Sequence, residues 1–164
     1  MLNFSTPELF CDVFDRLERD GVRYVVTSGV AVALRGHARP IVDLDIVIDP
    51  APEEADSALR ALARCGFVPS LPLPLSMLSV LRMFDASRRE VDLFVRYHVP
   101  FADLWAGSER VRVGESVARV VSLDHLLRIK RINGRPHDLL DIAGLLALGE
   151  RGGAGEERAG ETAD

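Results

Sequence analysis

The chain has 164 residues, of which 48% are hydrophobic and 27% are charged, and its net charge is −5. This composition is typical of one globular domain and excludes wholesale disorder, coiled coils and collagen-like fibres. No apolar run reaches the roughly 18 residues of a membrane span, so no membrane partner is expected, and contact with nucleic acid would need a local basic patch. Two cysteines cannot form a disulfide framework, so we expect a reducing, cytoplasmic location.

The first half of the chain alternates helices with short apolar strands. Pro7 suits the first position of a helix, apolar residues follow at helical spacing, and Gly21 ends this predicted helix. Residues 22–26 are apolar and β-rich, which predicts a buried strand. The elements predicted next are a short helix at 30–34, a strand at 42–48 and a helix that begins at 50–52 and stops at Gly66.

The second half combines short strands with two closing helices. Residues 69–76 contain three prolines, which predicts irregular structure. The predicted elements are a hairpin of strands 77–84 and 90–95, a short helix at 99–105, short strands at 111–113 and 118–121, and helices at 123–132 and 138–148. Residues 149–164 lack apolar anchors, so we expect a disordered tail after a single domain that spans 1–148. This order predicts the α/β or α+β class, a mixed β-sheet flanked by helices, with the C-terminal helices packed on it.

Two aspartates lie in the predicted strand 42–48. Side chains alternate along a strand, so Asp43 and Asp45 lie on the same face. Two neighbouring carboxylates in a buried strand repel each other, and a hard divalent cation such as Mg²⁺ removes that repulsion. The pair alone leaves open the alternative that both carboxylates are simply solvated at a strand end.

A third carboxylate lies in the predicted strand 90–95. If this strand lies beside the first, Asp92 joins the aspartate pair, and three carboxylates around two cations are the arrangement of two-metal phosphoryl or nucleotidyl transfer. Glu90 shares the face of Asp92 but stands at the start of the strand, so we favour Asp92. The alternative for Asp92 is an ion pair with a neighbouring arginine, Arg88, Arg89 or Arg96.

A turn of small residues follows the first predicted strand. Gly29 allows a ligand to approach the backbone closely, and the N-terminus of the next helix offers free N–H groups to an anion. Tight strand-to-helix turns also use glycine simply for packing. For Ser28 and Gly29 taken alone, this packing role is the open alternative.

Ser28-Gly29, the interval that follows, Asp43-Leu-Asp45 and the later strand carboxylate resemble the nucleotidyltransferase superfamily of the polymerase-beta type. The resemblance is closer to its small bacterial branch and covers residues 22–148. Residues 24–46 are similar to the first half of that branch, and residues 123–142 are similar to its C-terminal helices. The branch includes minimal nucleotidyltransferases and AbiEii-type toxins of toxin–antitoxin systems.

The resemblance implies a role for each matching residue around the turn and the strands. Asp43, Asp45 and Asp92 would bind Mg²⁺ or Mn²⁺, and Asp92 would also be the general base for the acceptor hydroxyl. Ser28 and Gly29 would hold the triphosphate of an NTP through backbone N–H groups and a hydroxyl.

The resemblance also implies roles for charged residues elsewhere. Lys130, the only lysine of the chain, would contact the nucleotide phosphates as a point charge. Arg39 would steady the same phosphates, with an ion pair to Asp43 as the alternative. Asp138 and Asp141 would orient Lys130 or cap the final helix, with plain solvated helix charges as the alternative.

The function that the resemblance implies is transfer of a nucleoside monophosphate from an NTP to a hydroxyl or phosphate acceptor. The acceptor stays open: a tRNA 3′ end would fit a toxin, a tyrosine of a partner protein would fit an antitoxin, and a small alcohol such as an aminoglycoside would fit a resistance enzyme. The net charge argues against a large RNA-binding surface. A toxin–antitoxin partner is a further expectation.

Two positions depart from the pattern of the branch. Ser28 stands where the branch usually has the first glycine of a pair, and Ile41 stands where it often has a threonine. Neither departure removes a metal ligand. They motivate the alternative function, a catalytically weak or inactive module of the same fold that binds a nucleotide or a partner.

Overall fold

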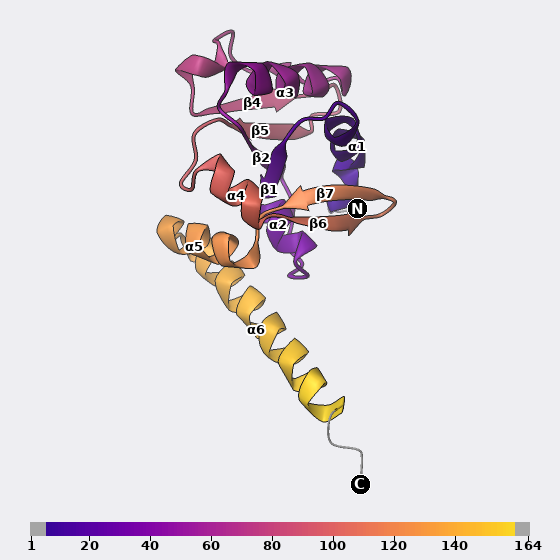
Figure 1. The fold of residues 1–164 in the computed structure, drawn as a ribbon, viewed down its shortest axis with the longest axis vertical. Coiled ribbons are helices and arrows are strands. Elements are labelled where there is room, and N and C mark those ends of the chain that lie inside the picture. The colour runs from indigo at the N-terminus through magenta and orange to yellow at the C-terminus, as the bar shows by residue number, and fades with distance from the viewer. Residues whose placement is uncertain (1–5, 160–164) are drawn as a thin grey trace.

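A seven-stranded mixed sheet forms the centre of the molecule (Figure 1). The structure is a computed structural model that describes the backbone of residues 6–159 and the side chains of residues 6–151. The strands are β1 (Tyr24–Thr27), β2 (Asp43–Ile48), β3 (Val68–Pro69), β4 (Val80–Phe84), β5 (Glu90–Phe94), β6 (Glu109–Val113) and β7 (Ser116–Val120), in the spatial order β3-β4-β5-β2-β1-β7-β6.

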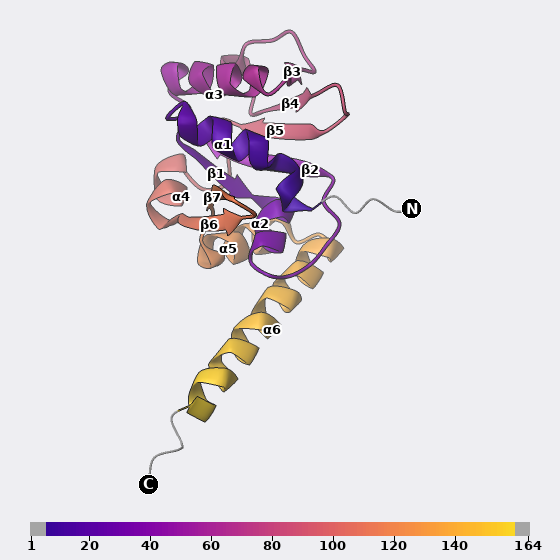
Figure 2. The same ribbon diagram turned by 90° about the vertical axis from the view of Figure 1, so that its right-hand side faces the viewer.

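Helices surround this sheet. They are α1 (Cys11–Arg19), α2 (Ser28–Leu34), α3 (Pro52–Arg64), α4 (Phe101–Gly107), α5 (Leu123–Asn133) and α6 (Pro136–Ala159), with 3₁₀ turns η1 (Pro7–Phe10) and η2 (Leu75–Met77). Helix α1 packs against α3 and β7, and α2 packs against β1, β2 and α5. Figure 2 shows α3 at one end of the molecule and α6 projecting from the other. The predicted fold class, a mixed sheet flanked by helices, is confirmed.

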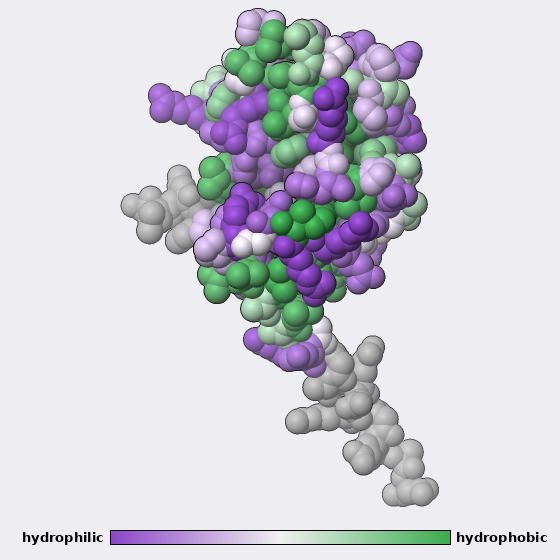
Figure 3. All heavy atoms as spheres, turned by 90° about the vertical axis from the view of Figure 1, so that its left-hand side faces the viewer, coloured by the Kyte–Doolittle hydropathy of each residue, from purple (hydrophilic) through white to green (hydrophobic). Residues whose placement is uncertain are grey.

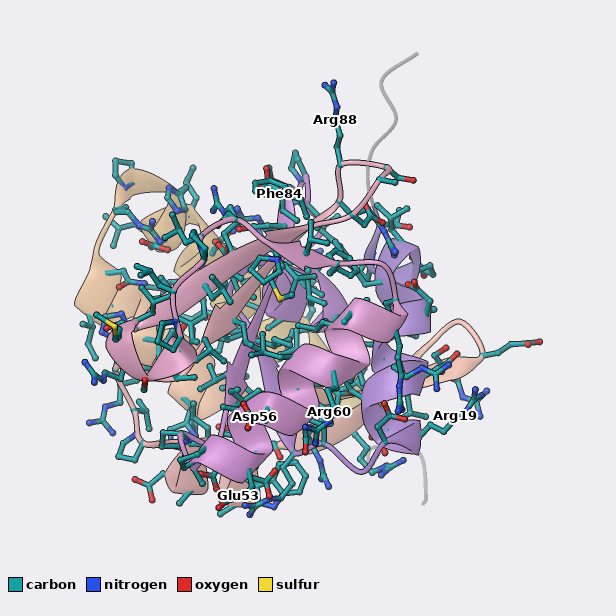
Figure 4. The ribbon with its side chains drawn as sticks, turned by 90° about the horizontal axis from the view of Figure 1, so that it is seen from above. Arg19, Glu53, Asp56, Arg60, Phe84 and Arg88 are labelled. Atoms are coloured by element: carbon teal, nitrogen blue, oxygen red, sulfur yellow. The ribbon has the colours of Figure 1, made fainter. Side chains whose placement is uncertain are left out.

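The pairing of the strands explains why the sheet is mixed. Strand β2 is antiparallel to β1 and parallel to β5, whereas β4 and β5 form the predicted antiparallel hairpin. The prediction that the strand at 90–95 lies beside the strand at 42–48 is therefore confirmed. Arg88 at the tip of the hairpin has a φ of 65° and points away from the molecule (Figure 4).

The core lies on both faces of the sheet. All four residues of β1 are buried, as expected for a central strand that helices cover on both sides. Helix α1 contributes Val13, Phe14 and Leu17, which recur at helical spacing and are fully buried. Among the helices of residues 6–159, none is long and apolar enough to cross a membrane.

Two segments differ from their predictions. The segment 69–76 was expected to be irregular, but Pro69 pairs with β4 as part of the edge strand β3, where a missing N–H donor is tolerated. The tail was expected to be disordered from residue 149, but α6 continues to Ala159. Extension of an existing helix needs no new nucleation, so a stretch without apolar anchors can remain helical. Residues 160–164 lie outside the described part of the chain.

Candidate active site

Three carboxylates converge where β2 and β5 lie side by side. In the register of these strands Asp45 stands opposite Asp92, and Asp43 precedes Asp45 on the same face. Asp43, Asp45 and Asp92 each offer an oxygen that lies within 4.8 Å of the other two. We call these three residues the carboxylate cluster. Glu90, the alternative to Asp92, is not a member of it.

The electrostatics of the carboxylate cluster are unfavourable in the absence of a cation. Burial and the charge of Asp43 raise the pKa of Asp45 to about 8, and burial together with Asp92 raises the pKa of Asp43. Burial also acts to raise the pKa of Asp92, but hydrogen bonds from Arg82 outweigh it and leave that pKa below its ordinary value. Asp45 Oδ1 is buried without a hydrogen-bond partner among the described residues. This donor set fits a hard divalent cation, because such an ion takes carboxylate oxygens and cancels their repulsion.

The turn before α2 lies next to the carboxylate cluster. Thr27, the last residue of β1, is in register with Asp45, so Ser28 follows directly beside it. Ser28 has a φ of 57°, in the left-handed region that a residue with a side chain seldom adopts. The hydroxyl of Ser28 acts to lower the pKa of Asp45. The guanidinium of Arg39 packs on the turn at Gly29, at a distance of 3.4 Å from where a Cβ would lie.

A second charged group joins α5 to α6. Lys130 is 3% exposed, and its Nζ lies 3.1 Å from Asp138 Oδ1 and 3.0 Å from Asp141 Oδ2. Arg39 donates to Asp141, so it does not make the ion pair with Asp43 that was the alternative. Asp138 also accepts from the backbone N–H of Arg135 at the start of α6. Asp138 therefore contacts Lys130 and caps the helix at the same time.

The electrostatics of this second group are favourable, in contrast to those of the carboxylate cluster. Burial acts to raise the pKa of Asp138, but hydrogen bonds from Arg135 and Lys130 outweigh it and hold the pKa at about 2. The buried carboxylate is therefore ionised and holds the Lys130 ammonium in place.

One cleft of about 390 Å³ brings these groups together. Seven of the residues that the sequence singled out line it: Ser28, Gly29, Arg39, Asp43, Asp45, Asp92 and Lys130. Ile41 lines it as well, at the position where the branch often has a hydroxyl. Asp138 and Asp141 lie behind Lys130 and are not part of the lining.

The cleft also contains residues that the sequence did not single out. They are Arg82, Phe94, Tyr97, Asn133, Arg135 and His137, together with Pro40 and Val42. The hydroxyls of Tyr97 and Thr27 lie 3.1 Å apart and share a hydrogen bond, and burial raises the pKa of Tyr97. A charge inside an apolar strand was the available signal for Arg82. Nothing in the loop around Tyr97 pointed to the cleft.

The arginine that pairs with Asp92 is not one of the three that the sequence suggested. Arg82 donates through Nε and Nη2 to the two carboxylate oxygens of Asp92, at 2.8 and 2.9 Å. Arg89 instead binds Asp85 and Asp12. The correction arises from the sheet, because Arg82 stands opposite Asp92 across the β4–β5 ladder.

Comparisons with known proteins show which solved structures share this fold. No protein-family profile and no curated protein matches the chain. Among solved structures, TM1012 from Thermotoga maritima, a candidate nucleotidyltransferase, is similar with a TM-score of 0.62 and 20% sequence identity. The match covers 85% of this chain and 91% of the TM1012 chain.

Two antibiotic-bound structures are also similar. The lincosamide antibiotic adenylyltransferase LnuA, bound to lincomycin, has a TM-score of 0.64 and 18% identity and covers 87% of this chain and 97% of its own. ANT(2″)-Ia in complex with adenylyl-2″-tobramycin has a TM-score of 0.63 and 11% identity and covers 86% of this chain and 87% of its own. At these identities the likeness concerns the fold alone, and the chain has the nucleotidyltransferase fold.

Proposed function

We propose that the protein transfers a nucleoside monophosphate from an NTP to a hydroxyl or phosphate acceptor, with pyrophosphate as the leaving group. The observation that carries this proposal is the convergence of Asp43, Asp45 and Asp92 beside the turn at Ser28 and Gly29, in one cleft. Similar folds in two antibiotic-bound nucleotidyltransferase structures support it.

The residues of the cleft divide into two groups with different tasks. The carboxylate cluster would hold Mg²⁺ or Mn²⁺, and such an ion would neutralise charge on the triphosphate and on the departing pyrophosphate. In the same cleft, Lys130 and Arg39 would present positive charge to the phosphates, and Asp138 and Asp141 hold Lys130 in place. Fixed charges of this kind stabilise the developing charge of a phosphoryl transfer without reorganisation.

Asp92 is the candidate general base. Against the effect of burial, the hydrogen bonds from Arg82 lower its pKa, which keeps the carboxylate ionised at neutral pH but makes it a weaker base, so the proposed role needs Arg82 to release at least one of its oxygens. In the proposed step the acceptor hydroxyl gives its proton to Asp92, its oxygen bonds to the α-phosphorus, and the bond to pyrophosphate breaks. Loss of a general base slows such a step by roughly 10²–10⁴-fold, and Asp92→Asn also removes a proposed metal ligand, so we expect this variant to slow label transfer by at least that factor.

The acceptor class is part of the proposal. LnuA with lincomycin and ANT(2″)-Ia with adenylyl-2″-tobramycin are small-molecule complexes, which favours a small alcohol over a tRNA or a protein. The net charge of −5 favours the same choice, because phosphate contacts dominate RNA affinity. A toxin–antitoxin partner is the less favoured setting, since the similar structures with known acceptors carry small molecules.

The test is label transfer from each α-labelled NTP in the presence of Mg²⁺ or Mn²⁺. Lincosamides, aminoglycosides, total tRNA and a protein extract serve as separate acceptors. We expect the wild type to label one class of acceptor and Asp45→Asn to label none. Asp56→Asn is the matched control, because Asp56 is exposed on α3 (Figure 4), outside the cleft lining.

Two outcomes would contradict the proposal. Transfer that is unchanged in Asp45→Asn would exclude the carboxylate cluster as the active centre. NTP binding by the wild type without label transfer to any acceptor would favour the alternative, a catalytically inactive nucleotide-binding module.

A further inference from the structure

A guanidinium lies against the carboxylate cluster in a position that the sheet dictates. Arg82 of β4 stands opposite Asp92 of β5, and Asp92 stands opposite Asp45 of β2. These three strands are neighbours in the sheet, so the three side chains form a row on one face. Position in the ladder, and not a flexible loop, brings the positive charge to the cluster.

The contacts of Arg82 occupy the carboxylate that would also be a metal ligand. Both oxygens of Asp92 accept hydrogen bonds from it, at 2.8 and 2.9 Å. The same guanidinium lies 3.7 Å from Asp43 Oδ2 and 3.8 Å from Glu90 Oε2. One side chain of this protein thus offsets the charge of Asp92 and part of that of Asp43, whereas Asp45 is left without this counter-charge.

The strength of the contact between Arg82 and Asp92 depends on how far each side chain is buried. The side chain of Arg82 is 49% exposed, so water competes for its charge, whereas Asp92 is buried and holds it through two hydrogen bonds, the geometry in which such a pair contributes most. A divalent cation among the same carboxylates would lie a few ångströms from the guanidinium, and like charges at that separation repel. Metal binding and the Arg82 contact therefore oppose each other, whether the arginine leaves Asp92 or stays.

We propose that Arg82 is a displaceable counter-cation of the carboxylate cluster. It neutralises Asp92 and Asp43 in the metal-free protein, competes with a divalent cation for Asp92, and so sets the affinity of the site for metal. The inference rests on the metal site of the proposed function. It adds that this affinity is lowered by a residue of β4 that is not itself a ligand.

The test is a titration of the nucleotide-free protein with Mn²⁺ alone, in which electron paramagnetic resonance measures the free ion. We expect Arg82→Gln to bind Mn²⁺ about tenfold more tightly than the wild type, because one repelling charge is removed at short range. Arg82→Lys should give an intermediate affinity, because it keeps the charge but loses the two-pronged contact with Asp92.

Arg110→Gln is the matched control. Arg110 is also a strand arginine, its side chain is 55% exposed, and it lies 3.6 Å from Glu18. It belongs to β6, at the opposite edge of the sheet from β3 and β4. Its replacement removes the same charge from the protein but should leave the Mn²⁺ affinity unchanged.

Thermal unfolding gives a second readout that a purely structural role would not produce. Without metal, Arg82→Gln should unfold at a lower temperature than the wild type, since the carboxylates lose their counter-charge. With Mn²⁺ its midpoint should rise by more than that of the wild type, because tighter binding to the folded state stabilises it further.

The outcomes separate this inference from the proposed function. If the wild type binds Mn²⁺ and Arg82→Gln binds it equally or more weakly, the inference is overturned while label transfer still tests the function. If none of these proteins binds Mn²⁺, both the inference and the proposed metal site are overturned.

Discussion

Ser28 shows how a single residue carries the strain of the candidate site. Its φ of 57° lies in the left-handed region, although Ser28 is the first residue of α2 and directly follows Thr27 of β1. A side chain there costs roughly 1–2 kcal/mol relative to a right-handed conformation. The turn keeps this strain at the point where the backbone passes the carboxylate cluster, as strained residues at functional sites often do.

A pair of substitutions at this residue isolates the strain. Ser28→Gly and Ser28→Ala both remove the hydroxyl, but only glycine adopts a positive φ without cost. We expect the Gly variant to have a free energy of unfolding about 1 kcal/mol higher than the Ala variant, as measured by urea denaturation without metal. Equal stabilities would mean that the left-handed backbone at this position is not strained.

Among the elements, α6 has the most unusual position. It leaves the body at the end opposite α3, and hydrophobic residues lie among hydrophilic ones where it departs (Figure 3). Its attachment depends on the ion pairs of Asp138 and Asp141 with Lys130 and on close packing of Gly144 against the imidazole of His37. The ion pairs that help to hold α6 are thus also those that hold Lys130 in the cleft.

Gly144→Ala tests this attachment. A Cβ at this position would overlap the ring of His37, so either the ring or the helix has to move. We expect a loss of about 1–3 kcal/mol in the free energy of unfolding, measured by chemical denaturation. Gly149→Ala in the same helix is the control: nothing lies within 4 Å of the added Cβ, so helix propensity should raise the stability by up to about 1 kcal/mol. Equal effects of the two substitutions would argue against close packing at Gly144.

For the molecule as a whole, the candidate site opposes stability. Folding brings β2 and β5 together and thereby forces three carboxylates into one place, with a buried oxygen of Asp45 left unpaired among the described residues. Distant contacts compensate for such costs: Arg89 ties the β4–β5 hairpin to α1 through Asp85 and Asp12 and lies over the rings of Phe10 and Phe67.

The cost of burying these carboxylates predicts how the stability of the protein without metal depends on pH. The pKa of Asp45 is raised from 3.8 to about 8 on folding, so between these values the folded state binds more protons than the unfolded state. Protonation of Asp45 therefore stabilises the folded state. This contribution is complete below about pH 4 and is lost as the pH rises towards about 8, so the free energy of unfolding should fall across that interval.

Asp45→Asn provides the comparison, measured by urea denaturation at a series of pH values in the presence of a chelator. The amide does not titrate, so the variant should gain roughly 1–3 kcal/mol over the wild type near pH 8 and lose that advantage near pH 4. Parallel pH profiles for the two proteins would show that Asp45 does not carry the charge penalty.

Much of the candidate site followed from local patterns. Alternation along a strand placed Asp43 and Asp45 on one face, and the apolar strand around Asp92 marked it as a partner for them. Arg82 and Tyr97 were missed, since neither lies within a motif. Their relation to the cleft depends on which strands pair and on where the loop after β5 turns, both of which involve contacts between distant residues.

The amino-acid sequence by itself determined the alternation of strands and helices, the shared face of the aspartate pair and the small-residue turn, because these depend on backbone preferences over a few residues. Only the tertiary structure decided that Arg82 neutralises Asp92, that Asp141 joins Arg39 to Lys130, and that α6 continues beyond residue 148. Strand register and helix packing select the partner of each charge, and the energy of a charge depends on its neighbours in space and on its burial.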